Sequence, residues 1–250
     1  MSSQAENNNR KGLGVTHHTW VEAESAIMGR IDAMKPVHVI TLTPEMCIQE
    51  FEDPEFRNII ESAGIVVADG VGVAWGERRL TGRKTEKVPG IDLAELILKY
   101  LAKTGGSVFL LGAKPDIARQ AIGNLLIRYP SIVTSGWQDG YFDVSEEEQV
   151  VERIAQTKSN VLLVGMGSPK QEIFIAKHLD KLNCGLAIGI GGTFDVWSGI
   201  VRRAPKIFRN TGLEWLYRTS TQPFSRVGRL HKLTRFIYLV LSGRIKQPEQ

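Results

Sequence analysis

One short stretch of the sequence has the features of a catalytic strand end: IVVADGVGVAWG, residues 65–76. Its apolar run from Ile65 to Ala68 is typical of a buried strand, and Asp69 follows directly before a glycine-rich turn. In open parallel sheets, ligands collect just beyond the carboxyl ends of the strands. A carboxylate there can act as a general base, so Asp69 is the catalytic candidate. The alternative is that Asp69 caps the next helix through the Gly70 turn.

Glycine-rich turns are the second chemical feature of the chain. Three of them follow apolar runs: ADGVGVAWG (68–76), LLVGMGSPKQE (162–172) and AIGIGGTFDVWSG (187–199). Glycine lets backbone N–H groups approach a phosphate closely, and a following helix N-terminus favours negative charge. Each turn alone could be an ordinary tight connection between a strand and a helix. The three together favour a site for a nucleotide diphosphate.

The sequence lacks the motifs of several other kinds of nucleotide site and of metal sites. The turn at Gly70, Gly72 and Gly76 reads GxGxxxG rather than GxGxxG, and Asp69 would place a negative charge beside the pyrophosphate of a dinucleotide. The sequence has no GxxxxGK[ST] loop, no HExxH motif and no DxD motif. We therefore expect no metal and no cofactor. If a diphosphate leaves, Lys, Arg and helix dipoles must stabilise it.

Strand-like and helical segments alternate along the chain and would position these turns. Apolar runs typical of strands occur at 37–42, 64–68, 107–112, 160–165 and 185–190, with a weaker run at 131–136. Helical patterns lie between them at 46–63, which Pro54 interrupts, and at 92–103, 115–129, 145–156 and 169–182. This alternation predicts an α/β fold, a doubly wound Rossmann-like parallel sheet of about six strands with helices on both faces.

The charge distribution distinguishes the end of the chain from its body. Residues 200–250 contain 11 Lys and Arg against two Asp and Glu, a net charge of +9, whereas the remainder contains 20 against 25, or −5. We predict a flexible tail at 1–12, a Rossmann-like catalytic domain at 13–199 and a helical appendage at 200–250. The basic appendage indicates an anionic partner: nucleic acid, a phospholipid surface or a phosphate-bearing substrate.

Cysteine use and hydropathy favour a cytoplasmic location. Cys47 and Cys184 lie far apart in apolar segments, which predicts buried free thiols in a reducing compartment. No apolar run approaches the roughly 20 residues of a membrane span, and the polar start lacks the apolar stretch of a signal peptide. Within the appendage, RVGRLHKLTRFIYLVL (226–241) interleaves basic and apolar residues at helical spacing. Such a helix can lie in an anionic bilayer interface or pack on the body.

Six motifs occur in an order and spacing that chance explains poorly: TLTPEM, VADGVGVAWGERRLTG, KVPGIDL, GSPKQE, GGTFDVWSGIVRRAPK and GLEWLYR. With them the chain, over roughly residues 15–230, resembles the WecG/TagA/CpsF family of glycosyltransferases, glycosyltransferase family twenty-six. The resemblance implies a peripheral enzyme on the inner face of the plasma membrane. It would move an N-acetylmannosamine-type hexose from UDP to an undecaprenyl-diphosphate-linked sugar in cell-surface polysaccharide synthesis. Inversion without a metal, and Asp69 as general base, are also implied.

The resemblance further implies substrate-binding residues near Asp69. Thr41 and Thr43 align with a Thr-x-Asn pair of the family near the acceptor, with threonine in place of the asparagine. Thr43 followed by Pro44 is equally an ordinary helix N-cap with proline at the first helical position. Lys87 stands where the family usually has arginine, and lysine offers a point charge instead of a planar fork.

Two of the glycine-rich turns carry further residues that the resemblance implies. Gln171 belongs to the active site of the family, although the serine, proline and glutamine of SPKQE would also form a capping box. Gly191 and Gly192 begin the GGTFD motif and are counted as substrate-binding. Asp195 in that motif either orients the loop or the sugar, or satisfies glycine N–H groups as a buried carboxylate.

The appendage contributes arginines to the implied site. Arg218 matches a family arginine within LYR, and Arg229 matches another. The EP of the family reads QP here, and its arginine two residues later is Ser225, for which Arg226 can substitute. In the family the appendage closes over the site at the membrane and its arginines meet the diphosphate, which would explain the charge of +9. The alternative is a solvated basic face.

Two other classes of function remain as alternatives. A nucleotide-sugar or NAD-dependent oxidoreductase or epimerase would need an acidic ribose-binding residue after a GxGxxG turn, and bound NAD would identify it. A nucleic-acid-binding module would use the basic appendage, but the sequence has no RNP-like or zinc-finger pattern, so we expect no nucleic-acid partner. The donated hexose, the acceptor and pathway, and association into a homo-oligomer stay open. So does the effect of Thr43, Lys87 and Ser225 on specificity or activity.

Overall fold

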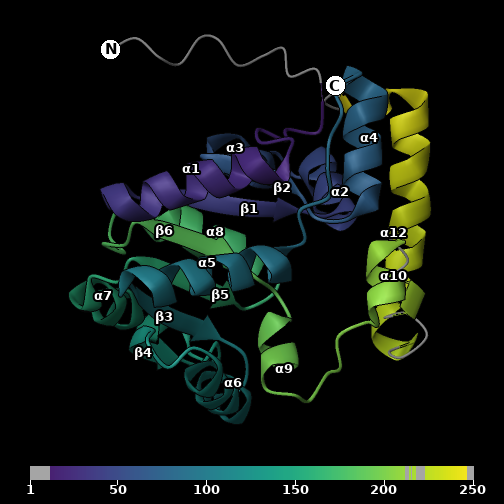
Figure 1. Ribbon diagram of the computed structural model, residues 1–250. Helices are drawn as coiled ribbons and strands as arrows, with labels where there is room; N and C mark the ends of the chain where they lie inside the picture. The colour runs from purple at the N-terminus through teal and green to yellow at the C-terminus, as the bar shows by residue number, and fades with distance from the viewer. Residues whose placement is uncertain (1–11, 212–213, 215, 218–222, 247–250) are drawn as a thin grey trace, which may run out of the picture.

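The protein is built on one twisted sheet (Figure 1). The structure, a computed structural model, describes residues 12–211, 214, 216–217 and 223–246. Six strands in this part of the chain pair in parallel, in the order β2-β1-β6-β5-β3-β4. They are β1 (His38–Leu42), β2 (Ile65–Ala68), β3 (Ser107–Gly112), β4 (Val133–Gln138), β5 (Val161–Gly165) and β6 (Leu186–Gly189). The predicted Rossmann-like α/β fold is confirmed.

The burial of each strand explains how clearly it could be recognised. In the centre, Leu163 of β5 pairs with Leu110 of β3 and with Ile188 of β6, and all three side chains are buried. A strand covered on both faces needs apolar residues at successive positions, which gives a continuous run. β4 lies at the edge with partly exposed residues, and it begins two residues later than the weak run predicted.

Helices cover both faces of the sheet, as expected of a doubly wound fold. One face packs against α1 (Trp20–Ala33), α5 (Gly90–Thr104), α6 (Pro115–Arg128) and α9 (Thr193–Trp197). The other packs against α2 (Pro44–Glu52), α3 (Pro54–Ser62), α4 (Val71–Thr81), α7 (Glu147–Thr157) and α8 (Lys170–His178). The interruption at Pro54 is confirmed, because Asp53 ends α2 and its carboxylate accepts N–H bonds from Glu55 and Phe56 as the cap of α3.

α1 is a helix that the apolar pattern did not indicate. It buries only Ala23, Ile27 and Ile31, a stripe of about one residue per turn that is too narrow to stand out. Its start is nevertheless fixed by a capping box, in which Thr19 accepts the N–H of Glu22 at 3.2 Å and the Glu22 carboxylate accepts the N–H of Thr19 at 3.3 Å.

The C-terminal helices run beside α4, away from the sheet (Figure 1). They are α10 (Lys206–Asn210), α12 (Pro223–Ser242) and the short helix η2 (Arg244–Lys246). Phe236, Leu239 and Val240 of α12 are buried in the same cluster as Leu13. A Cβ on Gly76 of α4 would lie 3.0 Å from Phe236 and 3.4 Å from Val240. This half of α12 therefore packs on the body as an amphipathic helix, one of the two arrangements expected for it.

The two cysteines are buried free thiols, as predicted. Cys47 lies in α2 and Cys184 just before β6. Burial raises the pKa of both thiols, that of Cys184 to about 12. Because the thiolate is the reactive form, neither residue is suited to act as a nucleophile.

The packing of Phe236 can be tested by truncation of its side chain. We expect Phe236→Ala to lower the free energy of unfolding by about 3 kcal/mol, because it leaves a cavity between α12, α2 and α4. Ile237→Ala is the matched control, since Ile237 is 39% exposed, and it should change the free energy by only about 0.5 kcal/mol. Urea denaturation measures both, and equal losses would contradict this packing.

Candidate active site

The candidate residues of the body lie along one edge of the sheet, because the carboxyl ends of parallel strands point the same way. Thr41 is near the end of β1, Asp69 directly follows β2, and Gly191 and Gly192 follow β6. β1 separates β2 from β6. Neighbouring strands lie about 4.8 Å apart, so the loops after β2 and β6 are separated by about 10 Å along this edge.

Asp69 continues the pairing of β1 with β2 by one residue. Its backbone N–H donates to the carbonyl of Leu42 at 2.8 Å, and its side chain is half-buried. α4 begins at Val71, and its N-cap residue is Gly70, whose φ of 96° is strained for any residue with a Cβ. The N-cap residue of α4 is thus Gly70, and Asp69 is the residue before it. The strand pairing holds the backbone of Asp69 at the end of the sheet.

The loop at 82–89 brings Lys87 to the same edge. The N–H of Val88 donates to the carbonyl of Ala68 at 2.7 Å, one residue before the candidate base. The Nζ of Lys87 donates to the backbone carbonyl of Arg209 in α10. Lys87 thus links this edge to the first of the C-terminal helices.

Thr41 and Thr43 both make structural contacts at this edge. Thr43 is the N-cap of α2, and its Oγ1 accepts the N–H of Met46 at 3.3 Å, with Pro44 in the first turn, so the N-cap interpretation is confirmed. The buried Thr41 packs against the start of α5, where a Cβ on Gly90 would lie 3.0 Å from its Oγ1. Glycine at the start of α5 lets that helix approach β1 closely.

A cavity of about 260 Å³ opens farther along the edge, and we call it the glycine cavity. Its lining includes Lys114 before α6, Gly167 after β5, and Gly191, Gly192 and Asp195 after β6. The connection that leaves β3 leads outward to β4, whereas the one that leaves β5 leads to β6 on the other side. The cavity therefore lies at a topological switch point, where open α/β sheets bind ligands. Two of the three predicted glycine turns meet here, while the turn after β2 lies beyond β1.

Two helices begin at this cavity without a side-chain cap. The N-cap residue of α6 is Lys114 and that of α8 is Pro169, and neither makes a capping hydrogen bond with its side chain. The N–H groups of an uncapped first turn favour an anion. The capping box expected from SPKQE is wrong, because α8 begins only at Lys170 and the side chain of Gln171 has other partners.

Gln171 joins the two glycine turns that line the cavity. Its Oε1 accepts the N–H of Gly167 at 3.2 Å and the N–H of Gly191 at 3.1 Å. Its Nε2 donates to Oε1 of Glu172 at 2.7 Å, which fixes the orientation of the amide. Both side chains are buried. Gln171 therefore positions the loops after β5 and β6 relative to each other.

Glu172 is a functional candidate that the sequence did not reveal. Its carboxylate is buried, and among the described residues its Oε2 has no hydrogen-bond partner. Burial raises the pKa of Glu172, and the hydrogen bonds from Gln171 and Ser168 reduce that rise. Only its place beside Gln171 in GSPKQE could have indicated it, because the partner of that glutamine is visible only in the fold.

Asp195 lies half-buried in the glycine cavity, on the short helix α9. Burial raises the pKa of its carboxyl, and the charge of Lys114 acts in the opposite direction. Within the part of the chain that the structure covers, no glycine N–H donates to this carboxylate. Only the backbone carbonyl of Asp195 takes bonds, from the N–H of Val201 and the hydroxyl of Ser198. The carboxylate is thus directed to the cavity lining rather than to the loop backbone.

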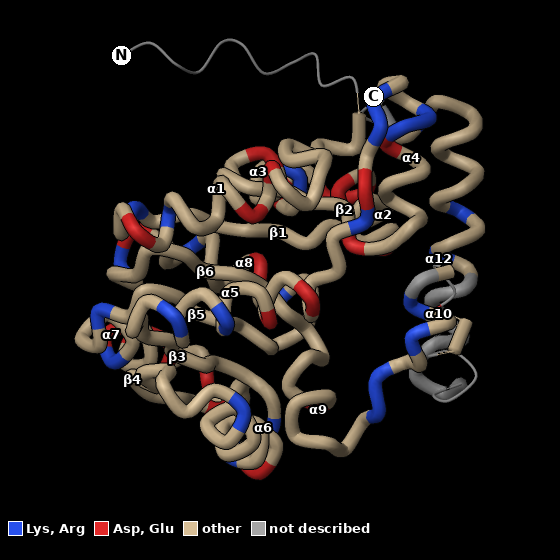
Figure 2. Tube along the Cα trace, viewed as in Figure 1, with Lys and Arg blue, Asp and Glu red and all other residues tan. Residues whose placement is uncertain are grey.

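The structure describes only part of the arginines that were expected from the appendage. Arg218 lies outside the described residues, and Arg226 and Arg229 belong to α12 with side chains outside them. Basic residues follow one another along the segment that leads to α10 (Figure 2). In it, Arg203 binds Asp92 of α5 at 2.6 Å. Arg203 belongs to the RRAPK motif. Asp92, the carboxylate that it binds, lies 111 residues away in the sequence.

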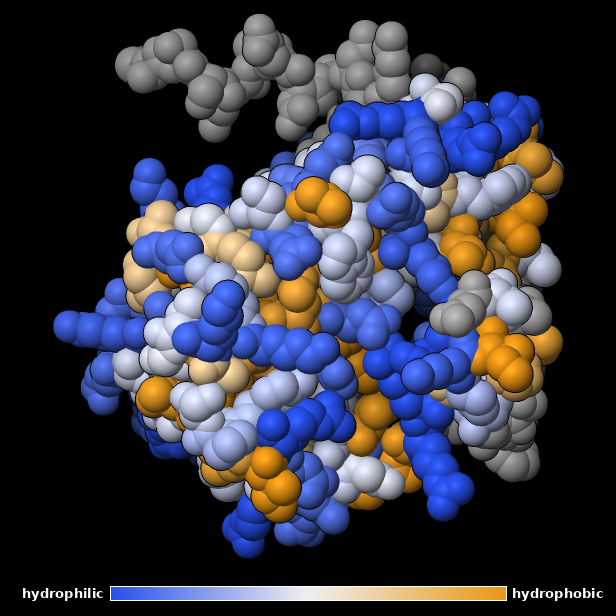
Figure 3. All heavy atoms as spheres, viewed as in Figure 1, coloured by the Kyte–Doolittle hydropathy of each residue, from blue (hydrophilic) through white to orange (hydrophobic). Residues whose placement is uncertain are grey.

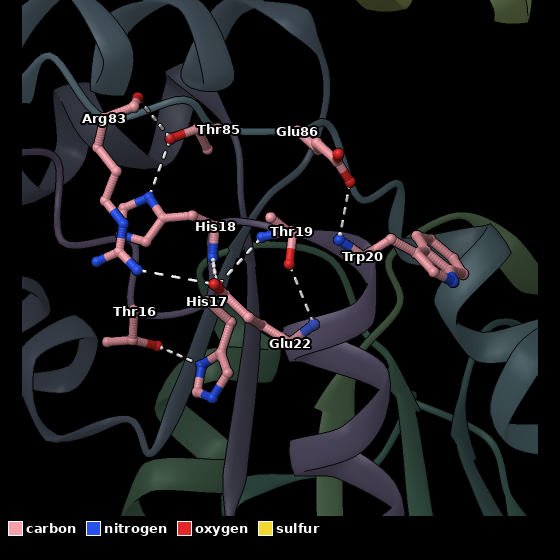
Figure 4. A network of polar contacts seen from close by, with 9 residues as sticks. All are labelled: Thr16, His17, His18, Thr19, Trp20, Glu22, Arg83, Thr85 and Glu86. Carbon is pink, nitrogen blue, oxygen red and sulfur yellow. Dashed lines mark hydrogen bonds and ion pairs between the residues drawn. The ribbon is translucent and has the colours of Figure 1, made fainter.

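A polar network near the start of the chain fixes the loop that carries Lys87 (Figure 4). The carboxylate of Glu86 accepts the N–H of Trp20 at 3.0 Å, and the N–H of Glu86 donates to the carbonyl of His18 at 2.8 Å. Nδ1 of His18 lies 2.9 Å from Oγ1 of Thr85. Burial lowers the pKa of His18. No motif pointed to these residues, because they meet only in the folded chain.

The buried carboxyl of Glu172 gives a pH-dependent prediction. Its pKa is 4.5 in the unfolded chain and higher in the folded protein, so its contribution to stability is present below pH 4.5 and is lost as the pH rises through the raised pKa. Glu172→Gln removes this loss. We expect the stability of Glu172→Gln, relative to the wild type, to increase between pH 4 and pH 8.

Urea denaturation at the two pH values measures that change, and Glu152→Gln, at an exposed position of α7, is the matched control. A difference between Glu172→Gln and the wild type that stays constant with pH would show that burial does not govern this carboxyl.

The comparison with known families agrees with this arrangement. The family model described as "Glycosyl transferase WecG/TagA/CpsF family" matches residues 9–250, nearly the whole chain. The match includes the strand end with Asp69, the two glycine turns of the cavity and the C-terminal helices. The chain belongs to the WecG/TagA/CpsF family of glycosyltransferases.

Proposed function

We propose that this protein is an inverting, metal-independent hexosyltransferase. The donor would be a UDP-sugar of the N-acetylmannosamine type, and the acceptor an undecaprenyl-diphosphate-linked sugar. Membership of the family supports a glycosyltransferase of cell-surface polysaccharide synthesis. The observation that carries the finer proposal is the position of Asp69 and the glycine cavity on one edge of the sheet, separated by the ends of β1 and β6.

The glycine cavity is the proposed site of the donor diphosphate. Lys114 supplies a positive charge, and the uncapped N-termini of α6 and α8 supply backbone N–H groups. Asp195 is placed to accept hydroxyl groups of the bound sugar nucleotide. The loops after β5 and β6 are held together by Gln171, so these groups converge on one ligand before it binds.

Asp69 is the proposed general base. The acceptor oxygen attacks the anomeric carbon of the donor sugar while the bond from that carbon to the UDP oxygen breaks. UDP keeps the electron pair of the broken bond, and Asp69 takes the proton of the acceptor hydroxyl. Attack from the face opposite to UDP inverts the anomeric centre. The transferred sugar would occupy the interval of about 10 Å between the loops after β2 and β6, and the diphosphate would lie beyond it at the ends of β5 and β3.

Replacement of Asp69 tests the mechanism. Asp69→Asn keeps the size of the side chain and much of its hydrogen bonding but removes its basicity. We expect transfer to fall about 10²- to 10⁴-fold while UDP-sugar binding is retained. UDP release with a panel of UDP-sugars and a short-chain prenyl-diphosphate-sugar measures transfer, and calorimetry measures binding. A fully active Asp69→Asn enzyme would exclude Asp69 as the base.

We also propose that the C-terminal helices contact the anionic inner face of the plasma membrane. Their segment has a net charge of +9, and Figure 2 marks its Lys and Arg along the trace. In Figure 3, apolar surface lies beside hydrophilic surface in this region. Ile207, Ile237, Tyr238 and Leu241 are exposed apolar residues there. An interfacial helix combines these properties. Among the helices that the structure describes, none has the length and apolar character to span a bilayer.

Point substitutions test this contact better than truncation, because Phe236 and its buried neighbours belong to the core. We expect the double variant Ile237→Ser/Leu241→Ser to bind anionic phospholipid vesicles several-fold more weakly than the wild type. Ile127→Ser, at an exposed site on α6, is the control. Vesicle co-sedimentation at low and high salt measures binding, and salt should weaken it. Unchanged binding of the double variant would refute the proposed contact.

A further inference from the structure

A second cavity, of about 390 Å³, opens between α1, α5 and α10, and we call it the α5 cavity. It begins at Lys87 and follows α5 past Asp92 to Lys99. Trp20 of α1 forms one wall, and Arg209 of α10 belongs to the lining on the opposite side. The surface is hollowed between the body and α10 in Figure 3. None of the residues that line the glycine cavity lines this one.

The α5 cavity adjoins the candidate base through the backbone. Its lining residues Lys87 and Pro89 lie on either side of Val88. The N–H of Val88 donates to the carbonyl of Ala68 at 2.7 Å, and Asp69 is the next residue. The cavity thus opens on the β2 side of the edge, whereas the glycine cavity lies on the β5 side. A molecule in the α5 cavity would therefore lie beside the loop that is bonded to the residue before Asp69.

Two carboxylates of the lining are fixed from outside the cavity. Oδ1 of Asp92 binds Arg203 at 2.6 Å, and Oε1 of Glu95 binds Arg128 at 2.9 Å. Asp92 and Glu95 are three residues apart on α5, so they share one face of the helix. Each ion pair uses one oxygen in the described structure and leaves the second oxygen as an acceptor. Such fixed acceptors suit the hydroxyl groups of a ligand.

Donors and charge balance complete the polar lining. The buried Nε of Arg209 has no hydrogen-bond partner among the described residues. The cations and anions of the lining are equal in number: Lys87, Lys99 and Arg209 against Asp92, Glu95 and Glu214. A neutral ring with many hydroxyl groups would meet both donors and acceptors.

Trp20 supplies the apolar surface that a sugar ring needs. Its backbone N–H is tied to Glu86 at 3.0 Å, and its indole ring is turned away from the polar network around His18 (Figure 4). Part of the ring packs against the core, and its indole N–H makes no hydrogen bond within the described structure. The C–H face of a pyranose can stack on an aromatic ring while its hydroxyl groups bond to the rim.

We infer that the α5 cavity binds the sugar of the lipid-linked acceptor. Trp20 stacks on the ring, and Asp92 and Glu95 accept its hydroxyl groups. The inference rests on the proposed transferase function and assigns the two cavities to the two substrates. Because the α5 cavity continues to Arg209 of α10, the diphosphate and lipid of the acceptor would extend from it toward the C-terminal helices.

Trp20→Ala tests this assignment through the Michaelis constants of the two substrates. The acceptor probe is a short-chain prenyl diphosphate that carries an N-acetylhexosamine. We expect the KM for this probe to rise about tenfold, with the KM for the UDP-sugar unchanged. Trp20→Phe should retain much of the affinity. Trp75→Ala, at an exposed tryptophan of α4, is the matched control. Glu95→Gln, which keeps the shape of the side chain, is the second variant if Trp20→Ala does not fold.

The outcomes separate this inference from the proposed function. A rise in the KM for the probe alone supports the acceptor cavity, whereas a rise in the KM for the UDP-sugar alone, or no change in either, overturns it. A wild-type protein that is inactive with every donor would instead refute the proposed function. In that case calorimetry with the probe decides: binding about tenfold weaker in the variant than in the wild type supports the cavity, and equal or absent binding overturns it.

Discussion

Parallel strand pairing is the constraint on which the other features of this protein depend. All the strands have their carboxyl ends at the same edge of the sheet, so each loop with a chemical role begins there. The hydrogen bonds of the sheet continue into these loops. Asp69 donates to the carbonyl of Leu42, and Val88 donates to that of Ala68. The backbone of the candidate base and that of the Lys87 loop are therefore as firmly placed as the strands.

The fold could be predicted because the central strands must be apolar at successive positions. Runs such as those of β5 and β6 follow from burial on both faces, and they were visible without any structural knowledge. β4 was weaker because its residues are exposed or only partly buried and several of them are polar, whereas the other edge strand, β2, is fully buried. α1 gave no signal because only Ala23, Ile27 and Ile31 are buried along its 14 residues. The number of buried apolar positions, rather than the place of a strand at the centre or edge of the sheet, decided how clearly each element could be recognised.

The candidate site was predictable to the extent that its parts are local in sequence. Asp69 and the glycine turns follow apolar runs directly, so their places at strand ends could be inferred. The ion pair of Arg203 with Asp92 and the bond from Trp20 to Glu86 join segments 111 and 66 residues apart. Arg, Asp and Glu are common residues, and when two of them lie this far apart in the sequence no local motif shows that they meet. The capping box, one of the two interpretations of SPKQE, is not formed because α8 begins only at Lys170 and the side chain of Gln171 bonds to both glycine loops.

The amide oxygen of Gln171 has a consequence for a ligand in the glycine cavity, such as the proposed donor. It accepts one N–H from each of two loops that reach the cavity from different strands. Neither loop can move without weakening its bond to this shared oxygen, so their conformations are thermodynamically linked. A ligand group that orders one loop lowers the entropic cost of ordering the second. The two ends of a sugar nucleotide, each held by one loop, would then bind with positive cooperativity, transmitted through a single side-chain oxygen.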